Sequence, residues 1–189
     1  VAEYNPFHLG HRYHIEKARQ QTGADSVVVA MSGNLVQRGD LSLTDKFIRA
    51  EEAVRNGADL VLEIPVCYSC QSAEIFAKGS IEILDSLGVV DFLAFGSESA
   101  DLCSIKKIAD ILTYEDEAFS RSIRGFLSEG MSYPLARQKA LAQITGADEQ
   151  SIMSSSNDIL AIEYLKNLNR LGSSITPVAV KRVSSTYND

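Results

Sequence analysis

Two histidines stand three residues apart near the start of the chain, in the segment Asn5-Pro6-Phe7-His8-Leu9-Gly10-His11. At the beginning of a helix, residues with this spacing direct their side chains to the same side. Imidazoles placed there, beside the helix N-terminus, can hold the oxygens of a triphosphate while charge develops on them. Gly10 leaves space for a phosphate or a base to approach the backbone. The segment therefore predicts a nucleotide-binding site with His8 and His11 as catalytic residues.

The same histidines have two other interpretations. In the first, they only cap a helix and stabilise it. In the second, His8, His11 and His14 bind a metal ion, but a helix turns by about 100° per residue and carries His14 well away from His8. We therefore expect no metal site of the protein's own, and Mg²⁺ that arrives with the nucleotide.

The three cysteines are informative about the cellular compartment of the protein and do not predict a zinc or redox site. Cys67 and Cys70 have the spacing of half a zinc or redox site, but a structural zinc ion needs four ligands and only Cys103 remains to supply another thiolate. An odd number of cysteines favours a reducing environment over a disulfide framework. We expect a cytoplasmic protein.

The elements that must position the histidines follow from apolar patterning. Runs at residues 27–31, 60–64 and 89–95 predict strands buried on both faces, and residues 1–4 resemble the end of an earlier strand. Helical patterns at 10–21, 44–56 and 72–87 separate them. For the second helix we expect Thr44 as the N-cap, and inward-facing side chains at Phe47, Ile48, Ala50 and Val54.

After Ser99 the pattern changes. Helices are predicted at 102–112, 115–127, 134–144 and 157–171 without an intervening strand, and a last strand at 175–183. Alternating strands and helices indicate right-handed βαβ units. The expected fold is α/β: a Rossmann-like parallel sheet with helices on both faces and a helical subdomain at about 101–172.

Composition excludes several classes. The 189 residues carry 18 Lys and Arg against 25 Asp and Glu, and 14 of those acidic side chains lie in residues 1–99 with only 8 basic ones. This half would repel a polyanion. No apolar run approaches the roughly 20 residues that span a bilayer, so no membrane partner is expected. The chain starts at Val1 and ends directly after an apolar run, so we expect both ends to be cut.

The segment Ala2-Glu3-Tyr4-Asn5-Pro6-Phe7-His8-Leu9-Gly10-His11 resembles the "HIGH"-type nucleotidylyltransferase superfamily. More narrowly, the chain resembles the bacterial tRNA(Met) cytidine acetate ligase family. The further blocks of this resemblance run in order along the chain: Met31-Ser32-Gly33-Asn34, Gln37-Arg38-Gly39, Asp45-Lys46, Gly57-Ala58-Asp59-Leu60-Val61, Ser72-Ala73-Glu74-Ile75-Phe76-Ala77, Phe95-Gly96-Ser97-Glu98, Ser156-Asn157-Asp158-Ile159-Leu160 and Lys181-Arg182.

The resemblance implies ATP-dependent activation of acetate to acetyl-adenylate, followed by acetylation of the wobble cytidine of elongator tRNA(Met). It also implies a C-terminal region beyond this chain. The residues that it assigns to ATP binding are Val1, Ala2, Glu3, Tyr4, Asn5, Pro6, Phe7, His8, Leu9, Gly10, His11, Arg12, Tyr13, His14, Gly96, Asn157 and Arg182. Taken singly, Gly96 could be a turn, Asn157 a helix cap and Arg182 a surface charge.

Two departures from the family pattern stand out. Leu9 occupies a position that is often polar, and Asn188 stands where a Tyr-His-Asp run is common. The run Val183-Ser184-Ser185-Thr186 imitates the superfamily's second phosphate motif, but no Arg follows at the required spacing. We expect the true counterpart downstream of Asp189.

The RNA partner is expected to bind outside residues 1–99. Candidate contacts are Lys106, Lys107, Arg121, Arg124, Arg137 and Lys139. The alternative is that these residues form a solvated helix face that binds no partner. Two rival functions remain open: a nucleotidylyltransferase that makes a cofactor from ATP and a phosphorylated small molecule, and a non-catalytic nucleotide-binding module. Acyl specificity, tRNA identity and oligomeric state stay open.

Overall fold

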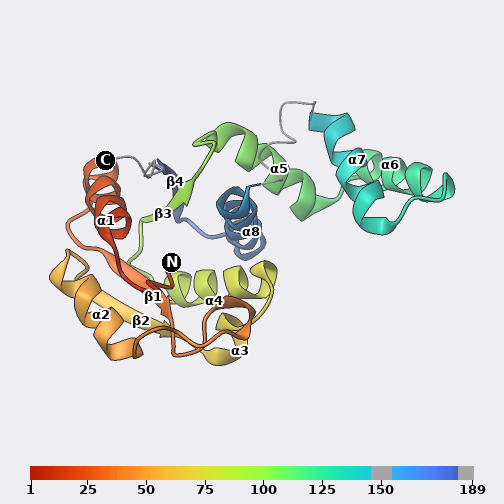
Figure 1. Ribbon diagram of the computed structural model, residues 1–189. Coiled ribbons are helices and arrows are strands. Elements are labelled where there is room, and N and C mark those ends of the chain that lie inside the picture. Colours follow the sequence, from red (N-terminus) through yellow and green to blue (C-terminus); the bar gives the residue numbers. More distant parts are fainter. Residues whose placement is uncertain (146–154, 183–189) are drawn as a thin grey trace, which may run out of the picture.

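A computed structural model describes residues 1–145 and 155–182, in which strands and helices alternate (Figure 1). The first half contains α1 (Leu9–Thr22), β1 (Val28–Ser32), a 3-10 turn at Gln37–Gly39, α2 (Lys46–Arg55), β2 (Leu60–Ile64), α3 (Val66–Ser69), α4 (Ala73–Ser86) and β3 (Phe92–Ser97). The second half contains α5 (Leu102–Tyr114), α6 (Glu117–Ser128), α7 (Tyr133–Thr145), α8 (Ser156–Leu171) and β4 (Thr176–Lys181).

The strands pair in parallel, as predicted. They form two two-stranded sheets: β1 pairs with β2 from Val28 opposite Leu60, and β3 pairs with β4 from Phe92 opposite Thr176. The N-terminal segment lies along β1, where the Ala2 N–H donates to the Ala30 carbonyl at 2.9 Å. Parallel strands bring their carboxyl ends to one edge, which is where open α/β sheets bind ligands.

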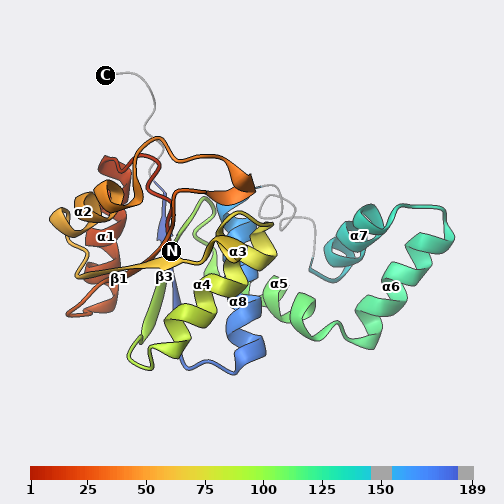
Figure 2. The same ribbon diagram turned by 90° about the horizontal axis from the view of Figure 1, so that it is seen from below.

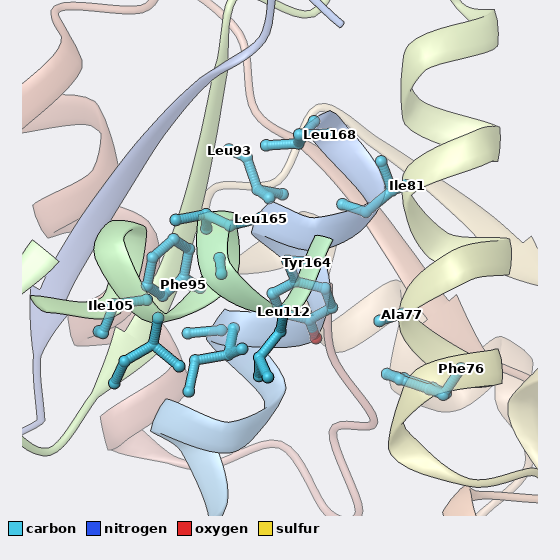
Figure 3. Close-up of a cluster of buried hydrophobic side chains, with 14 of the residues drawn as sticks. Phe76, Ala77, Ile81, Leu93, Phe95, Ile105, Leu112, Tyr164, Leu165 and Leu168 are labelled. Atoms are coloured by element: carbon cyan, nitrogen blue, oxygen red, sulfur yellow. The ribbon is translucent and has the colours of Figure 1, made fainter. Parts of the chain in front are cut away.

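Helices cover both faces of the strands, and β1 shows this residue by residue. Ala30 belongs to a large core with α4, α5 and α8, whereas its neighbours Val29 and Met31 belong to a second core with α1 and α2. Figure 3 shows part of the large core, including Ile81 of α4, Ile105 of α5 and Leu165 of α8. Successive side chains of a strand point to opposite faces. The expected Rossmann-like α/β architecture is confirmed.

Helices α6 and α7 pack against each other and project from the body of the molecule, and both views show this (Figures 1 and 2). Helices α5 and α8, by contrast, pack together against the sheet and α4. The excursion between β3 and β4 thus returns to the sheet through α8. No helix in the described part of the chain is long and apolar enough to cross a membrane.

Several predicted boundaries were wrong. Strand β3 starts at Phe92 and not at residue 89, because Gly88 turns the chain in the left-handed region (φ 67°) and Val89 is 76% exposed. Glu115 does not begin a helix but ends α5 with a φ of 41°. The predicted last strand ends at Lys181, and its expected end at Val183 lies outside the described residues.

Helix α2 differs most from its prediction. Asp45, not Thr44, is the N-cap, and its carboxylate accepts the Phe47 N–H at 2.8 Å. Phe47 is 73% exposed, whereas Arg49 is 1% exposed. The Arg49 guanidinium is buried because it donates to the carbonyls of Glu3, Gly33 and Thr44. The second predicted strand also departs from expectation, since β2 is half-exposed and not buried on both faces.

Candidate functional site

Helix α1 begins with a reciprocal hydrogen-bonded pair of histidines. His8 is the N-cap, and its Nδ1 accepts the Gly10 N–H at 3.1 Å. In return, the His8 N–H donates to Nδ1 of His11 at 3.2 Å. Side-chain oxygens of Ser, Thr, Asp or Asn usually occupy the N-cap position. Here imidazole nitrogens satisfy the first N–H groups of the helix.

This pairing leaves the other nitrogen of each ring for a ligand. A neutral imidazole whose Nδ1 accepts a hydrogen bond carries its proton on Nε2. Among the described residues, no hydrogen bond engages Nε2 of His8 or His11. The capping and binding interpretations are therefore compatible, because the capping bonds fix the tautomer that presents an N–H donor outward.

Aromatic packing holds the pair in place. The rings of His8 and His11 stack with centroids 3.7 Å apart and planes inclined by 22°. Tyr4 is 4% exposed and lies edge-on to His11 at 4.8 Å and to Phe7 at 4.9 Å. Burial raises the pKa of Tyr4. The backbone at Tyr4 has a φ of 51°. Tyr4 lies between Ala2, which pairs with β1, and the start of α1 at Leu9.

The electrostatics of this end of α1 favour uncharged imidazoles. Burial, together with the nearby His8, His14 and Arg182, lowers the pKa of His11 to about 4. Burial likewise lowers the pKa of His14 to about 4. The Nε2 atom of His14 is buried without a hydrogen-bond partner in the part of the chain that the structure describes. At neutral pH, the His11 ring is thus uncharged and its Nε2 can donate a hydrogen bond.

The carboxyl ends of β3 and β4 lie beside this histidine pair. The Arg182 N–H donates to the Ser97 carbonyl at 3.0 Å, which extends the pairing of the two strands by one residue. The Arg182 side chain lies over Gly96, so that a Cβ there would come within 3.4 Å of Arg182 Cγ. The aliphatic part of the Arg182 side chain thus lies within van der Waals distance of the position that a Cβ on residue 96 would take.

Glu98 joins Arg182 to the N-terminus of α8. Its carboxylate accepts hydrogen bonds from Ser155 Oγ and, at 2.5 Å, from Asn157 Nδ2, and it lies 3.9 Å from Arg182 Nε. Burial opposes ionisation of Glu98, but the hydrogen bonds from Ser155 and Asn157 outweigh it and hold the pKa below its usual value. The sequence analysis did not single out Glu98; its place directly after an apolar strand was the available signal.

The buried carboxylate of Asp158 joins α8 to the end of β3 in the same region. Asp158 is 1% exposed and accepts hydrogen bonds from Ser97 Oγ and, at 3.1 Å, from the Ser99 N–H. Buried charge is tolerated where hydrogen bonds satisfy it. Asp158 therefore fixes the start of α8 to the end of β3.

The structure thus gathers the predicted residues from four segments of the chain. We call His8, His11, Gly96, Asn157 and Arg182 the edge cluster. Asn157 is not the N-cap of α8, since Ser155 occupies that position.

Other residues assigned by the resemblance have structural contacts of their own. The side chains of Glu3 and Asn5 accept the N–H groups of Gln37 and Leu43 at 2.8 and 2.7 Å. Arg12 pairs with Glu16 at 2.8 Å on the outer face of α1. Leu9 is 83% exposed. These contacts leave backbone groups of residues 1–14, more than their side chains, available to a nucleotide.

A second polar group lies at the carboxyl ends of β1 and β2. Lys46 Nζ pairs with Glu63 at 2.6 Å, and the Lys46 N–H donates to Asn34 Oδ1 at 2.8 Å. A Cβ on Gly33 would collide with the Glu63 carboxylate. The motif Met31-Ser32-Gly33-Asn34 thus serves close packing at this edge.

The cysteine and metal hypotheses find no support in contacts. Cys70 Sγ donates to the Val66 carbonyl at 2.9 Å, and Cys67 and Cys103 are exposed. Within residues 1–145 and 155–182, no group of three or more His, Cys, Asp or Glu side chains could hold a metal ion. The predictions at Val183-Ser184-Ser185-Thr186 and at Asn188 lie outside the described residues.

Comparison with known proteins extends these findings. A tRNA(Met) cytidine acetate ligase of Clostridium novyi is 47% identical over all of this chain and 48% of its own length. Another from Caldicellulosiruptor bescii is 47% identical over all of this chain and 46% of its own length. These relatives bear the name of the family that the sequence motifs resemble. The chain spans about half the length of the relatives it matches.

Solved structures agree with the sequence relatives. Thermotoga maritima TmcAL, crystallised with alpha-thio ATP, superposes with a TM-score of 0.91 at 40% identity and covers all of this chain with 47% of its own. The family described as HIGH Nucleotidyl Transferase matches residues 1–189. Both the histidine segment and the full extent of the fold therefore agree: the chain belongs to the HIGH nucleotidyl transferase family.

Proposed function

We propose that the protein activates acetate with ATP and transfers the acetyl group to the wobble cytidine of elongator tRNA(Met). The observation that carries this proposal is the pair of capping histidines beside Arg182, with each Nε2 left for a ligand. The names of the relatives and the ATP analogue bound to the Thermotoga maritima protein support the same reaction.

In the first step, a carboxylate oxygen of acetate attacks the α-phosphorus of ATP. The bond from this phosphorus to the bridging oxygen breaks, and pyrophosphate leaves in line. His8 and His11 donate from Nε2 to the phosphate oxygens on which charge accumulates, and Arg182 adds a positive charge. This step needs no nucleophile from the protein.

In the second step, the amino nitrogen of cytidine attacks the carbonyl carbon of acetyl-adenylate. AMP leaves, and the nitrogen loses one proton as N4-acetylcytidine forms. A base of an anticodon loop can reach such a site because single-stranded bases can be splayed out of the stack. The reaction would take place in the cytoplasm.

The nucleotide lies, in this proposal, over residues 1–14 and the edge cluster. Mg²⁺ bound to the ATP substrate would supply positive charge that offsets the charge of the pyrophosphate. We assign the whole chain to an ATP-binding domain with a helical subdomain at about 101–172, and we place the family's C-terminal region outside it.

The RNA is held mainly outside residues 1–99. In this proposal the helical subdomain supplies basic contacts, with Arg121 and Arg124 exposed on α6. Arg121 Nε and Arg124 Nε donate only to carbonyls of their own helix, at 3.3 Å each, so their guanidinium groups keep donors for phosphate.

Acetate-dependent exchange of labelled pyrophosphate into ATP, measured on the full-length protein, tests the proposal. We expect exchange that requires acetate and does not require tRNA. Exchange with a phosphorylated cofactor precursor and none with acetate would instead establish the cofactor-forming nucleotidylyltransferase. Binding of ATP without exchange under either condition would indicate a non-catalytic module.

A further inference from the structure

The loop after β1 and the first turn of α2 expose a group of large apolar side chains. Leu41, Leu43, Phe47 and Ile48 have exposed fractions of 77%, 75%, 73% and 54%. In the part of the chain that the structure describes, these residues belong to neither hydrophobic core. Single exposed apolar side chains are ordinary, but a group of them within residues 41–48 indicates an interaction surface. We call these residues the α2 patch.

Hydrogen bonds fix the loop that carries the first half of the α2 patch. The Ser42 N–H donates to the Asn34 carbonyl at 3.0 Å, and the Val36 N–H donates to the Asp40 carbonyl at 2.9 Å. Helix α2 turns its other face to the protein, where Ala53 is fully buried in the second core. The apolar side chains therefore cannot turn inward without breaking these contacts, and their exposure belongs to the folded conformation.

The α2 patch lies at the edge of the molecule that binds the nucleotide in the proposed reaction. The Leu43 N–H donates to Asn5 Oδ1 at 2.7 Å, which ties the loop to the segment that precedes α1. At the other end of that segment, His11 is close enough to Arg182 for the guanidinium to lower its pKa. Arg182 directly follows β4. A chain that continues past β4 therefore leaves the sheet at the edge where the α2 patch lies.

The surroundings of the patch favour a protein surface over RNA. Asp40, Asp45 and Glu51 are exposed beside it, whereas Lys46 is paired with Glu63 at 2.6 Å. Exposed carboxylates repel the phosphates of a nucleic acid. Helices α6 and α7, to which the proposed function assigns RNA contacts, project from the opposite side of the molecule (Figures 1 and 2).

The length of the relatives supplies an occupant. The chain covers 48% and 46% of two curated relatives and 47% of the Thermotoga maritima protein, so about half of each has no counterpart here. Resting on the proposed function, which places the family's C-terminal region outside this chain, we propose that this region docks on the α2 patch. Its docking surface is apolar where it meets Leu43 and Phe47. The docked region then lies next to Asn5, beside the nucleotide.

Photo-cross-linking in the full-length protein tests this docking. The photoreactive amino acid p-benzoylphenylalanine replaces Phe47 in one variant and Val89 in the other. Val89 is a matched control, because it is 76% exposed and precedes β3 at the opposite edge of the sheet. Cross-links form only between groups in contact. We expect Phe47→p-benzoylphenylalanine to link to a peptide beyond Asp189 of the same molecule, and the Val89 variant to form no such link.

The competing occupants give different products. In a mixture of isotope-labelled and unlabelled protein, links that join a labelled to an unlabelled peptide would show that a second copy covers the patch. Links to added tRNA would show that RNA covers it. Either result overturns the proposal, as do links confined to residues 1–189 or the absence of any link.

A charged substitution provides a second readout in the full-length protein. Phe47→Asp places a carboxylate in the apolar contact, and Val89→Asp is the control. We expect amide hydrogen exchange beyond Asp189 to be faster by about tenfold or more in Phe47→Asp, the scale of losing one aromatic anchor. Exchange in β1 should stay unchanged, which reports that the domain remains folded. Equal exchange beyond Asp189 in the two variants would also overturn the docking.

These measurements require neither ATP nor acetate, so they fail separately from the proposed function. Docking without acetate-dependent pyrophosphate exchange contradicts the proposed reaction alone. Acetate-dependent exchange without a link from residue 47 to the region beyond Asp189 contradicts the docking alone.

Discussion

The imidazole of His11 accepts the backbone N–H of His8 while its ring stacks on that of His8, with centroids 3.7 Å apart. The His11 side chain therefore completes the capping box that begins with the N-cap His8, and its Nε2 remains as an N–H donor. The chemistry of the site and the local stability of α1 depend on the same two residues.

Replacement of His11 tests its place in the mechanism. We expect His11→Ala to lower acetate-dependent pyrophosphate exchange by about 10²-fold or more, the usual scale for removing one transition-state donor. Loss of the hydrogen bond from the His8 N–H to His11 Nδ1 should cost about 1 kcal/mol of stability, so the variant should still fold, as thermal unfolding will report. Lys17→Ala, on the outer face of α1, is the matched control. Wild-type exchange in folded His11→Ala would remove His11 from the mechanism.

The position of the nucleotide can be tested by crystallography. With a non-hydrolysable ATP analogue, we expect the phosphates over Phe7 to His11 and Arg182, at the carboxyl edge of β3 and β4. This placement follows from the Nε2 donors and from Gly96. An analogue bound between α6 and α7 would contradict it.

The histidine pKa values predict how stability depends on pH. His11 and His14 have pKa values of about 4 in the folded protein against about 6.5 in the unfolded chain. Between these values the unfolded chain binds protons that the native state does not, so stability rises with pH. This contribution to stability should be complete above about pH 6.5 and decline toward pH 4, by up to about 1.4 kcal/mol per pH unit for the buried His14 and by less for His11, which solvent partly screens.

Urea unfolding at a series of pH values from 4.5 to about 7.5 measures this effect. In His11→Asn/His14→Asn the slope between about pH 4.5 and 6.5 should flatten, because neither side chain then titrates. His8→Asn serves as the comparison at the same helix end. An unchanged slope in the double variant would assign the pH dependence to other groups.

Asp158 should be important for stability. Asp158→Ala leaves the Ser97 hydroxyl and the Ser99 N–H without an acceptor in a buried region, which should cost about 2–4 kcal/mol. Asp110→Ala removes an exposed carboxylate that binds Asn169 at 2.7 Å, and it should cost less than about 1 kcal/mol. Denaturant titration compares the two, and equal losses would refute the role assigned to Asp158.

The RNA-binding prediction concerns the helices after β3. Charge reversal should weaken tRNA binding and reduce its salt dependence while pyrophosphate exchange stays nearly unchanged. The variant carries Glu at Lys106, Lys107, Arg121 and Arg124. Reversal at Lys17, Arg55 and Lys78 provides a control of similar charge within residues 1–99. If this chain alone bound elongator tRNA(Met) as tightly as the full-length protein at physiological salt, the proposed division of labour would be wrong.

Sequence patterns predicted the features that depend on near neighbours along the chain. The apolar runs located β1 and β2, and the spacing of His8 and His11 placed both rings on one side of α1. The start of β3 was missed because apolar Val89 lies in a turn, and hydrophobicity alone does not distinguish an exposed valine from a strand residue.

Features that depend on distant contacts were not predictable in this way. Arg49 is buried by its hydrogen bonds to the carbonyls of Glu3, Gly33 and Thr44, whereas Phe47, predicted to face inward, is exposed. Glu98 acquires its partners Ser155 and Asn157 only when α8 returns to the sheet. The residues next to Glu98 in the sequence do not indicate that α8 will pack beside it.

The long excursion between β3 and β4 also has a consequence for how the molecule is made. Strands β1 and β2 are joined by a single helix and can pair as soon as residue 64 has left the ribosome, whereas β3 finds its partner only after α8 and β4 have been synthesised. Pairings of such large sequence separation form late. We therefore expect a nascent chain that ends before Thr176 to fold the core that β1 forms with α1 and α2. This chain should bind no ATP, because Arg182 completes the site last.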